Sequence, residues 1–321
     1  MEINEVLSNH NVIKQSQSTT VDYFEGGYHQ NNFIDYSHNK KQYLAIETYD
    51  SKDYLNLIDY SGEKRIRYNR VMNWAINDSI MLDDRIILGQ QSVTSCLLGL
   101  DYNGNIIFEY SNDISAIFSN SDSIGLHDKK NLLYFILDSP SKSKSYIYEF
   151  SLNGVLNKKI EVPKNYRIQS YIFDGENFYC SQSSTLLNIG TDGQIIKEKR
   201  FSQNVQVIHF SNNSIYVNVG GKYTVIDKNS FDTITETKEL GGHYQTRKYN
   251  NKLIINYGND IYILHPTRIS YSGIDKKDKV LGYVKLLLSI NNSTNTLKTH
   301  KNTALMNDNN NKLRYIEGGL K

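Results

Sequence analysis

The strongest constraint on the fold is a unit of about forty residues that recurs along most of the chain. In its clearest copy, from Asn212, NNSIYVNVGG is followed by KYTVIDKNSFDTITETKELG. Each copy has a polar doublet, a short apolar strand, a tight turn, a second strand, another turn and a third strand. Aligned on the first apolar residue after the doublet, the copies have their anchors at Tyr43, Ile86, Leu132, Phe178, Ile215 and Leu253.

The residue pattern inside each unit predicts β-hairpins. Short continuous apolar runs indicate strands that are covered on both faces, and alternation with polar residues indicates a half-solvated outer strand. In the first four units a glycine follows the end of the second strand by three residues, where a tight hairpin needs a positive φ. These glycines are Gly62, Gly104, Gly154 and Gly193. For the fifth unit we expect strands at Val205–Phe210, Ser214–Val219, Tyr223–Asp227 and Thr233–Leu240.

The two ends of the chain carry incomplete units. STTVDYFEGGYHQ, from Ser18, matches TITETKELGGHYQ, from Thr233, so 18–24 reads as a fourth strand without the other three. The tail has a strand near Thr303, an Asn-rich turn and a strand at Lys312–Ile316, with 280–290 as its first strand. Pairing the N-terminal strand with this tail would remove two open sheet edges.

We therefore predict an all-β chain that forms a single domain over residues 1–321, a β-propeller of four-stranded blades. Seven blades are favoured over six, with the N-terminal strand closing the C-terminal blade. Residues 1–17 are an N-terminal extension, and the blades are expected at about 26–70, 71–112, 113–163, 164–202, 203–240, 241–275 and 276–318, the last closed by 18–24.

The pattern resembles the β-propeller superfamily of WD40-like and quinoprotein-like repeat proteins over about Ser18 to Gly318. The Trp-Asp dipeptide and Gly-His signature of WD40 repeats are missing, as are the tryptophan-docking repeats of quinone-cofactor dehydrogenases. The resemblance implies an architecture and leaves the function open. Propellers of this kind serve as binding platforms, and they also host lyases, hydrolases and oxidoreductases.

The composition of the chain argues against nucleic acid as a partner and against a membrane-spanning segment. The 36 Lys and Arg residues are spread along the chain among 34 Asp and Glu residues, without the concentrated basic footprint of a nucleic-acid binder. The polar N-terminus shows no secretory signal, and the most apolar run, 280–290, is too short to span a bilayer. We expect a soluble protein, cytoplasmic or virion-associated. Cys96 and Cys180 lie in strand-like runs and are expected in the core.

Two similar segments are candidates for a ligand-binding site. GGYHQ and GGHYQ each join a fourth strand to the first strand of the next blade, and such loops ring one mouth of a propeller's channel. Their polar and aromatic residues could bind a sugar or an anion, and packing between blades is the alternative. A metal site needs three or four converging ligands, so no metal and no cofactor is predicted. The candidate residues are Tyr28, His29, Gln30, Trp74, His243, Tyr244 and Gln245.

No catalytic signature stands out: G-x-S-x-G, G-x-G-x-x-G and a phosphate-loop lysine are all missing from the sequence. Loops rich in tyrosine, serine and asparagine suit recognition. The first hypothesis is a non-enzymatic module that binds a protein partner or a glycan through one face, in one version as a surface or virion attachment component. The alternative is a lyase or hydrolase at the channel mouth, with His29 and His243 as acid–base groups.

Overall fold

A computed structural model describes seventeen stretches of the chain. These are residues 18–21, 30–37, 40, 42–49, 52–59, 65–72, 76–90, 97–111, 124–139, 144–163, 168–240, 244–249, 252–257, 260–273, 298–300, 303–307 and 313–317. The chain divides into two compact units, Met1–Val71 with Thr235–Lys321, and Met72–Ile234.

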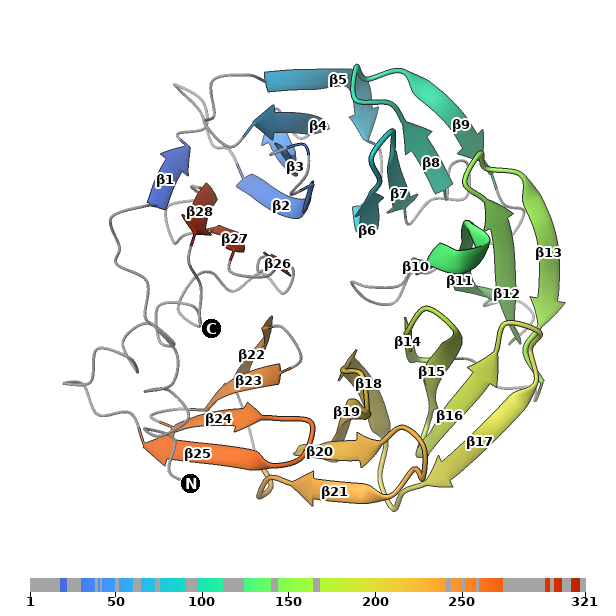
Figure 1. Ribbon diagram of the computed structural model, residues 1–321, viewed down its shortest axis with the longest axis vertical. Coiled ribbons are helices and arrows are strands. Elements are labelled where there is room, and N and C mark those ends of the chain that lie inside the picture. Colours follow the sequence, from blue (N-terminus) through green and yellow to red (C-terminus); the bar gives the residue numbers. More distant parts are fainter. Residues whose placement is uncertain are drawn as a thin grey trace. The chain divides into compact units, whose positions relative to one another are not determined.

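The second unit holds four four-stranded sheets, and in each the strands are hydrogen-bonded in chain order (Figure 1). Each sheet is named here by its strands. The β6–β9 sheet has Ile76–Met81, Ile86–Gln90, Leu97–Leu100 and Ile106–Tyr110, and the β10–β13 sheet has Gly125–His127, Leu132–Ser139, Lys144–Ser151 and Leu156–Glu161. The β14–β17 sheet has Ser170–Phe173, Asn177–Gln182, Thr185–Gly190 and Ile195–Arg200, and the β18–β21 sheet has Val205–Phe210, Ser214–Val219, Lys222–Asp227 and Thr233–Glu236. A short 3-10 helix, η2 (Asp128–Lys130), joins β10 to β11.

The first unit holds three more four-stranded sheets. The β2–β5 sheet has Gln30–Ser37, Gln42–Tyr49, Lys52–Asp59 and Arg65–Met72, and the β22–β25 sheet has Tyr244–Tyr249, Lys252–Tyr257, Asp260–Leu264 and Ile269–Gly273. The third sheet combines the two ends of the chain in the order β1-β28-β27-β26, from Ser18–Val21, Leu313–Glu317, Thr303–Asn307 and Lys298–His300. In it β1 runs antiparallel to β28, with Ser18 opposite Ile316 and Val21 opposite Leu313.

The hydrophobic core of the second unit lies between its sheets. Second and third strands are almost wholly buried, as in β16, where five of six residues are buried, and fourth strands are largely exposed, as in β13 and β17. Three clusters join successive sheets, so each sheet packs its faces on its neighbours. They include Ile87 with Phe135, Ile136 with Phe178, and Ile172 with Val217.

Polar contacts add to this packing at the first strands. The Asp78 carboxylate in β6 accepts a hydrogen bond of 2.6 Å from the backbone N–H of Ile124, just before β10. Ser170 in β14 likewise accepts a bond of 2.9 Å from the N–H of Val207 in β18. A buried backbone N–H without a partner costs free energy, so each bond opposes sliding of one sheet along the face of the next.

Several sequence predictions can be compared with these elements. Two strands of the fifth repeat, Val205–Phe210 and Ser214–Val219, are confirmed to the residue. Its fourth strand is shorter than predicted and ends at Glu236, although Thr237 and Leu240 are buried. The edge strand next to β27 is Lys298–His300, whereas the prediction placed the first strand of this unit at 280–290, which lies outside the described residues.

The predictions for the hairpin glycines and the cysteines are confirmed where the structure describes these residues. Gly104, Gly154 and Gly193 have φ values of 91°, 77° and 83°, as the hairpin prediction requires. Cys180 is fully buried, as expected. Gly62 and Cys96 lie outside the described residues.

Candidate functional site

The structure describes little of the sequence-predicted ligand site. Gln30 is the first residue of β2, and Tyr244 and Gln245 open β22, so they begin the first strands of two sheets in the first unit. Their side chains are not among those described. Tyr28, His29, Trp74 and His243 lie outside the described residues altogether. The site therefore remains a prediction.

Within the described residues, the most elaborate polar contacts lie where the turns of successive sheets meet in the second unit. In an antiparallel four-stranded sheet, the first and third turns lie at the same end. At two places the first turn of one sheet bonds to the third turn of the next sheet. We name these places the Arg85 junction and the Lys228 junction.

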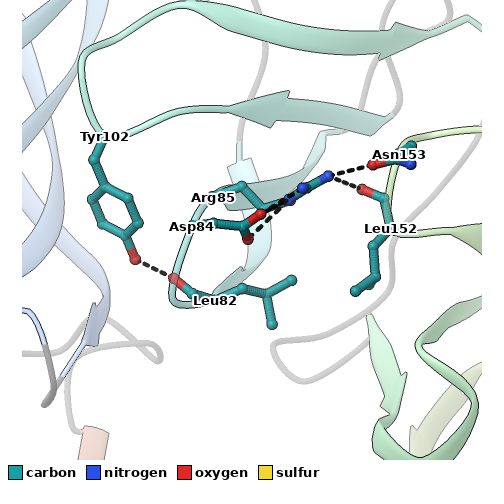
Figure 2. Close-up of polar contacts among 6 residues, drawn as sticks. All are labelled: Leu82, Asp84, Arg85, Tyr102, Leu152 and Asn153. Atoms are coloured by element: carbon teal, nitrogen blue, oxygen red, sulfur yellow. Dashed lines mark hydrogen bonds and ion pairs between the residues drawn. The ribbon is translucent and has the colours of Figure 1, made fainter.

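The Arg85 junction joins the β6–β9 sheet to the β10–β13 sheet (Figure 2). Arg85, in the turn before β7, donates from Nη1 to the Leu152 carbonyl oxygen at 2.9 Å and to Asn153 Oδ1 at 2.7 Å. Its other nitrogens bind the Asp84 carboxylate, with Nη2 2.5 Å from Oδ2. The hydrogen bonds to Asp84 raise the pKa of Arg85. The same turn accepts a bond at the Leu82 carbonyl oxygen from the Tyr102 hydroxyl.

The Lys228 junction joins the β14–β17 sheet to the β18–β21 sheet. Lys228 Nζ, in the turn after β20, lies 2.6 Å from Asp174 Oδ2, and the two side chains are only 14% and 8% exposed. The ammonium also lies 5.4 Å from the ring centre of Tyr179 and 5.5 Å from that of Phe210. The ion pair is therefore enclosed by aromatic rings, where a cation–π contact adds to the attraction.

This enclosure sets the ionisation of the groups around Lys228. Burial alone would raise the pKa of Asp174, but hydrogen bonds from Lys228 and from the N–H groups of Asn177 and Glu176 outweigh it and lower the pKa. Burial, together with the nearby Asp174 carboxylate, raises the pKa of Tyr179 far above its ordinary value of 10.0. At neutral pH the junction therefore holds an ionised carboxylate beside a neutral phenol.

The fourth strands of the first three sheets also contact the third turn of the next sheet. A Cβ at Gly154 would overlap the Phe108 ring of β9, and one at Gly193 would come 2.7 Å from Ile160 Cγ2 of β13. Lys199 of β17 donates to the Phe231 carbonyl oxygen at 2.7 Å and to Thr233 Oγ1 at 3.2 Å. These contacts make one continuous outer border across the four sheets.

Acidic and amide side chains shape the third turns themselves. Asp101 Oδ1 accepts bonds from the N–H groups of Asn103 and Asn105, and Asp227 Oδ1 does the same for Asn229 and Ser230. A side-chain hydrogen bond from Asn105 Nδ2 is the main cause that lowers the pKa of Asp101, and the backbone bond from Ser230 is the main cause that lowers the pKa of Asp227. Aspartate suits these turns because its carboxylate accepts hydrogen bonds from the turn's own backbone N–H groups.

The described residues contain no group of three or more His, Cys, Asp and Glu side chains that could hold a metal ion. The His209 ring stacks on the Tyr216 ring, with 5.7 Å between the ring centres. Among the described residues, no helix is long and apolar enough to cross a membrane.

The junction residues could not be found from sequence alone. Arg85 and Asn153 are 68 positions apart in the chain, and neither lies in a recognisable motif. The one usable signal is positional, because both belong to turns that the repeat aligns.

Comparison with known proteins finds structures with a similar fold but no matching protein family. No protein-family model and no curated protein sequence matches the chain. Among solved structures, BamB from Moraxella catarrhalis is 12% identical with a TM-score of 0.54, covering 88% of this chain and 83% of BamB. The Pan2 WD40 domain of Neurospora crassa is 10% identical with a TM-score of 0.54, covering 90% of both chains.

A third similar structure is Raptor from Chaetomium thermophilum, 7% identical with a TM-score of 0.58, covering 92% of this chain and 28% of Raptor. Identities this low carry the fold alone. The four-stranded antiparallel sheets and these similarities together show that the chain is a β-propeller, with no particular family assigned within that fold.

Proposed function

We propose that the protein is a non-enzymatic interaction scaffold, a seven-bladed β-propeller that binds a protein partner through its surface. Seven four-stranded sheets among the described residues support the blade number. The pairing of β1 with β28 supports closure of the ring by the N-terminal strand. Such a closure would leave no sheet open to its neighbour, which suits a rigid platform.

The observation that carries the proposal is the outer border of the second unit. The junction bonds and the fourth-strand contacts hold the third turns in fixed positions. Exposed aliphatic side chains follow those turns directly. Rigid, partly apolar surface favours association because little conformational freedom is lost when a partner binds.

Affinity capture tests this function. The full chain, immobilised through a terminal tag, is exposed to an extract of its source cells, and bound proteins are identified by mass spectrometry. Each candidate is then purified and titrated against the chain. The proposal expects a direct complex with a micromolar or tighter dissociation constant. If no purified candidate binds and a glycan array is strongly positive, the protein is a glycan-binding module and the proposal fails.

The enzymatic alternative rests on residues that the structure does not describe. Its sequence motivation is the proximity expected for His29 and His243. Alanine variants of both histidines, assayed in any activity screen that the wild-type protein passes, would test it. Loss of that activity with unchanged unfolding would favour an enzyme over a scaffold.

A further inference from the structure

Exposed aliphatic side chains in the described part of the chain gather at one structural position. Five such residues have exposed fractions between 37% and 60%, and each lies in a fourth strand or just before one. They stand where the third turn of a sheet leads into its outermost strand. We call them the aliphatic row: Ile106, Ile107, Val155, Ile196 and Ile234.

The members of the row lie on neighbouring sheets that touch at this border. Phe108, next to Ile107, packs on Gly154, which is next to Val155. Lys199, in the same strand as Ile196, bonds to Thr233, which is next to Ile234. The row therefore occupies the same border position in each of the four sheets of the second unit.

Bulges in the fourth strands show how a partner could engage the row. The pairing of β8 with β9 shifts register so that Ile107 is left without a partner on β8, and the pairing of β16 with β17 leaves Ile196 in the same position. Bulges on an outermost strand disfavour edge-to-edge pairing with another strand. A partner would therefore bind the row through side chains and not by adding a strand.

The turns that precede the row carry negative charge. Asp101, Asp192, Asp227 and Asp232 lie in the third turns of the sheets that present the isoleucines. The one cation in those turns, Lys228, points inward to Asp174 and is largely buried. The fourth strands add the exposed cations Lys158, Lys159, Lys197 and Arg200, of which Lys197 acts on Asp227, and the exposed carboxylates Glu109, Glu161 and Glu198. Along this border, carboxylates outnumber exposed cations.

We propose that the aliphatic row and these four aspartates form a docking surface for a partner-protein segment in which aliphatic side chains alternate with lysine or arginine. The aliphatic side chains of the segment would cover the isoleucines, and its cations would face the turns. The proposal rests on the scaffold function and specifies the chemistry of its partner. Opposite charge at the border would also speed association.

Two synthetic peptides of equal length test the chemistry, one of alternating leucine and lysine and the other of alternating leucine and glutamate. Each carries a fluorophore and is titrated with the full chain by anisotropy. The lysine peptide should bind, and it should bind more weakly as salt concentration rises. Equal binding of the glutamate peptide, or binding indifferent to salt, would overturn the proposal.

Variants locate the binding. Ile196→Ser with Ile234→Ser should weaken the lysine peptide about tenfold or more, since two apolar contacts are lost. Asp192→Asn with Asp232→Asn should weaken it about threefold to tenfold and flatten the salt dependence. Gln206→Ser, at an exposed neutral position of the first strand β18, is the control and should change nothing. Thermal unfolding confirms that each variant is folded.

The remaining outcomes are distinct. Unchanged peptide binding by the isoleucine double variant would overturn the docking surface. If a captured protein partner still binds that variant, the scaffold function stands and only the docking surface fails. Self-association of the wild-type chain that the double variant abolishes would make the row a contact between copies, and would also overturn the proposal.

Discussion

The Arg85 and Lys228 junctions perform the same structural task with different chemistry. In both, the first turn of one sheet is bonded to the third turn of the next sheet. At the Arg85 junction a partly exposed guanidinium reaches a neutral carbonyl and an amide. At the Lys228 junction an ion pair is enclosed by aromatic rings. The repeat thus determines where the turns meet. The residues at each junction determine how much the contact between the turns stabilises the protein and how this stabilisation depends on pH.

The largest expected effect comes from breaking the Lys228 junction. Lys228→Met removes the cation and leaves the Asp174 carboxylate buried, which should cost about 3–5 kcal/mol in the free energy of unfolding. Urea denaturation measures the loss. Adding Asp174→Asn to Lys228→Met should recover much of it, because the unpaired charge is gone. A loss below about 1 kcal/mol would show that the pair is solvated like a surface ion pair.

The next effect concerns the outer contact beside the Arg85 junction. Gly154→Ala puts a Cβ into the Phe108 ring and into a backbone with φ of 77°, so about 2–4 kcal/mol should be lost. The matched control lies at the Lys228 junction. Gly175→Ala also places a side chain at a positive φ, here 99°, but with no atom within 4 Å of the new Cβ, and should lose only about 1–2 kcal/mol. Equal losses in urea denaturation would contradict the Phe108 contact.

Breaking the Arg85 junction should have a smaller effect than breaking the Lys228 junction. Arg85→Ala removes two hydrogen bonds to the next sheet, an expected loss of about 1.5–3 kcal/mol. Asp84→Asn is the matched control, because the Asp84 side chain is 64% exposed and should contribute less than about 0.5 kcal/mol. If both variants lose the same stability, the bonds of Arg85 to Leu152 and Asn153 add nothing.

The smallest effect is a pH dependence that distinguishes the two junctions. The pKa of Asp174 in the folded protein lies below its ordinary value of 3.8. Its stabilising contribution is therefore fully present above that value and is lost as the pH falls through the folded-state pKa. The stability difference between wild type and Lys228→Met should narrow below about pH 4. The difference for Arg85→Ala should change by less than about 0.5 kcal/mol, since its acceptors on the next sheet are neutral and its ion pair with Asp84 is largely exposed. Calorimetry at a series of pH values measures both.

The sequence predicts the repeated local structure well, and it predicts contacts between repeats poorly. The strands at 205–210 and 214–219 follow from apolar runs bounded by turn residues, and the hairpin glycines follow from steric rules. The predicted end of the fourth strand at Leu240 is wrong. Alternation there reflects burial of Thr237 and Leu240, and burial alone does not require strand pairing.

The candidate docking surface and the junctions depend on side chains brought together over long separations. Lys228 and Asp174 belong to different repeats, and each looks like an ordinary turn residue in its own segment. The aliphatic row is equally hidden, because nothing in the sequence distinguishes Ile107 and Ile196 from strand residues that are paired in register. The sequence-predicted site at His29 and His243 stays a prediction.

Closure of the ring through the N-terminal strand is the claim on which the scaffold depends most. It is tested by replacing Thr19 and Tyr315, which lie opposite each other on β1 and β28, with cysteine. The account predicts a disulfide between positions 19 and 315, found by non-reducing peptide mapping, and stabilisation of about 2–4 kcal/mol that a reductant abolishes. Two free, reactive thiols at these positions in the oxidised, folded protein would contradict it.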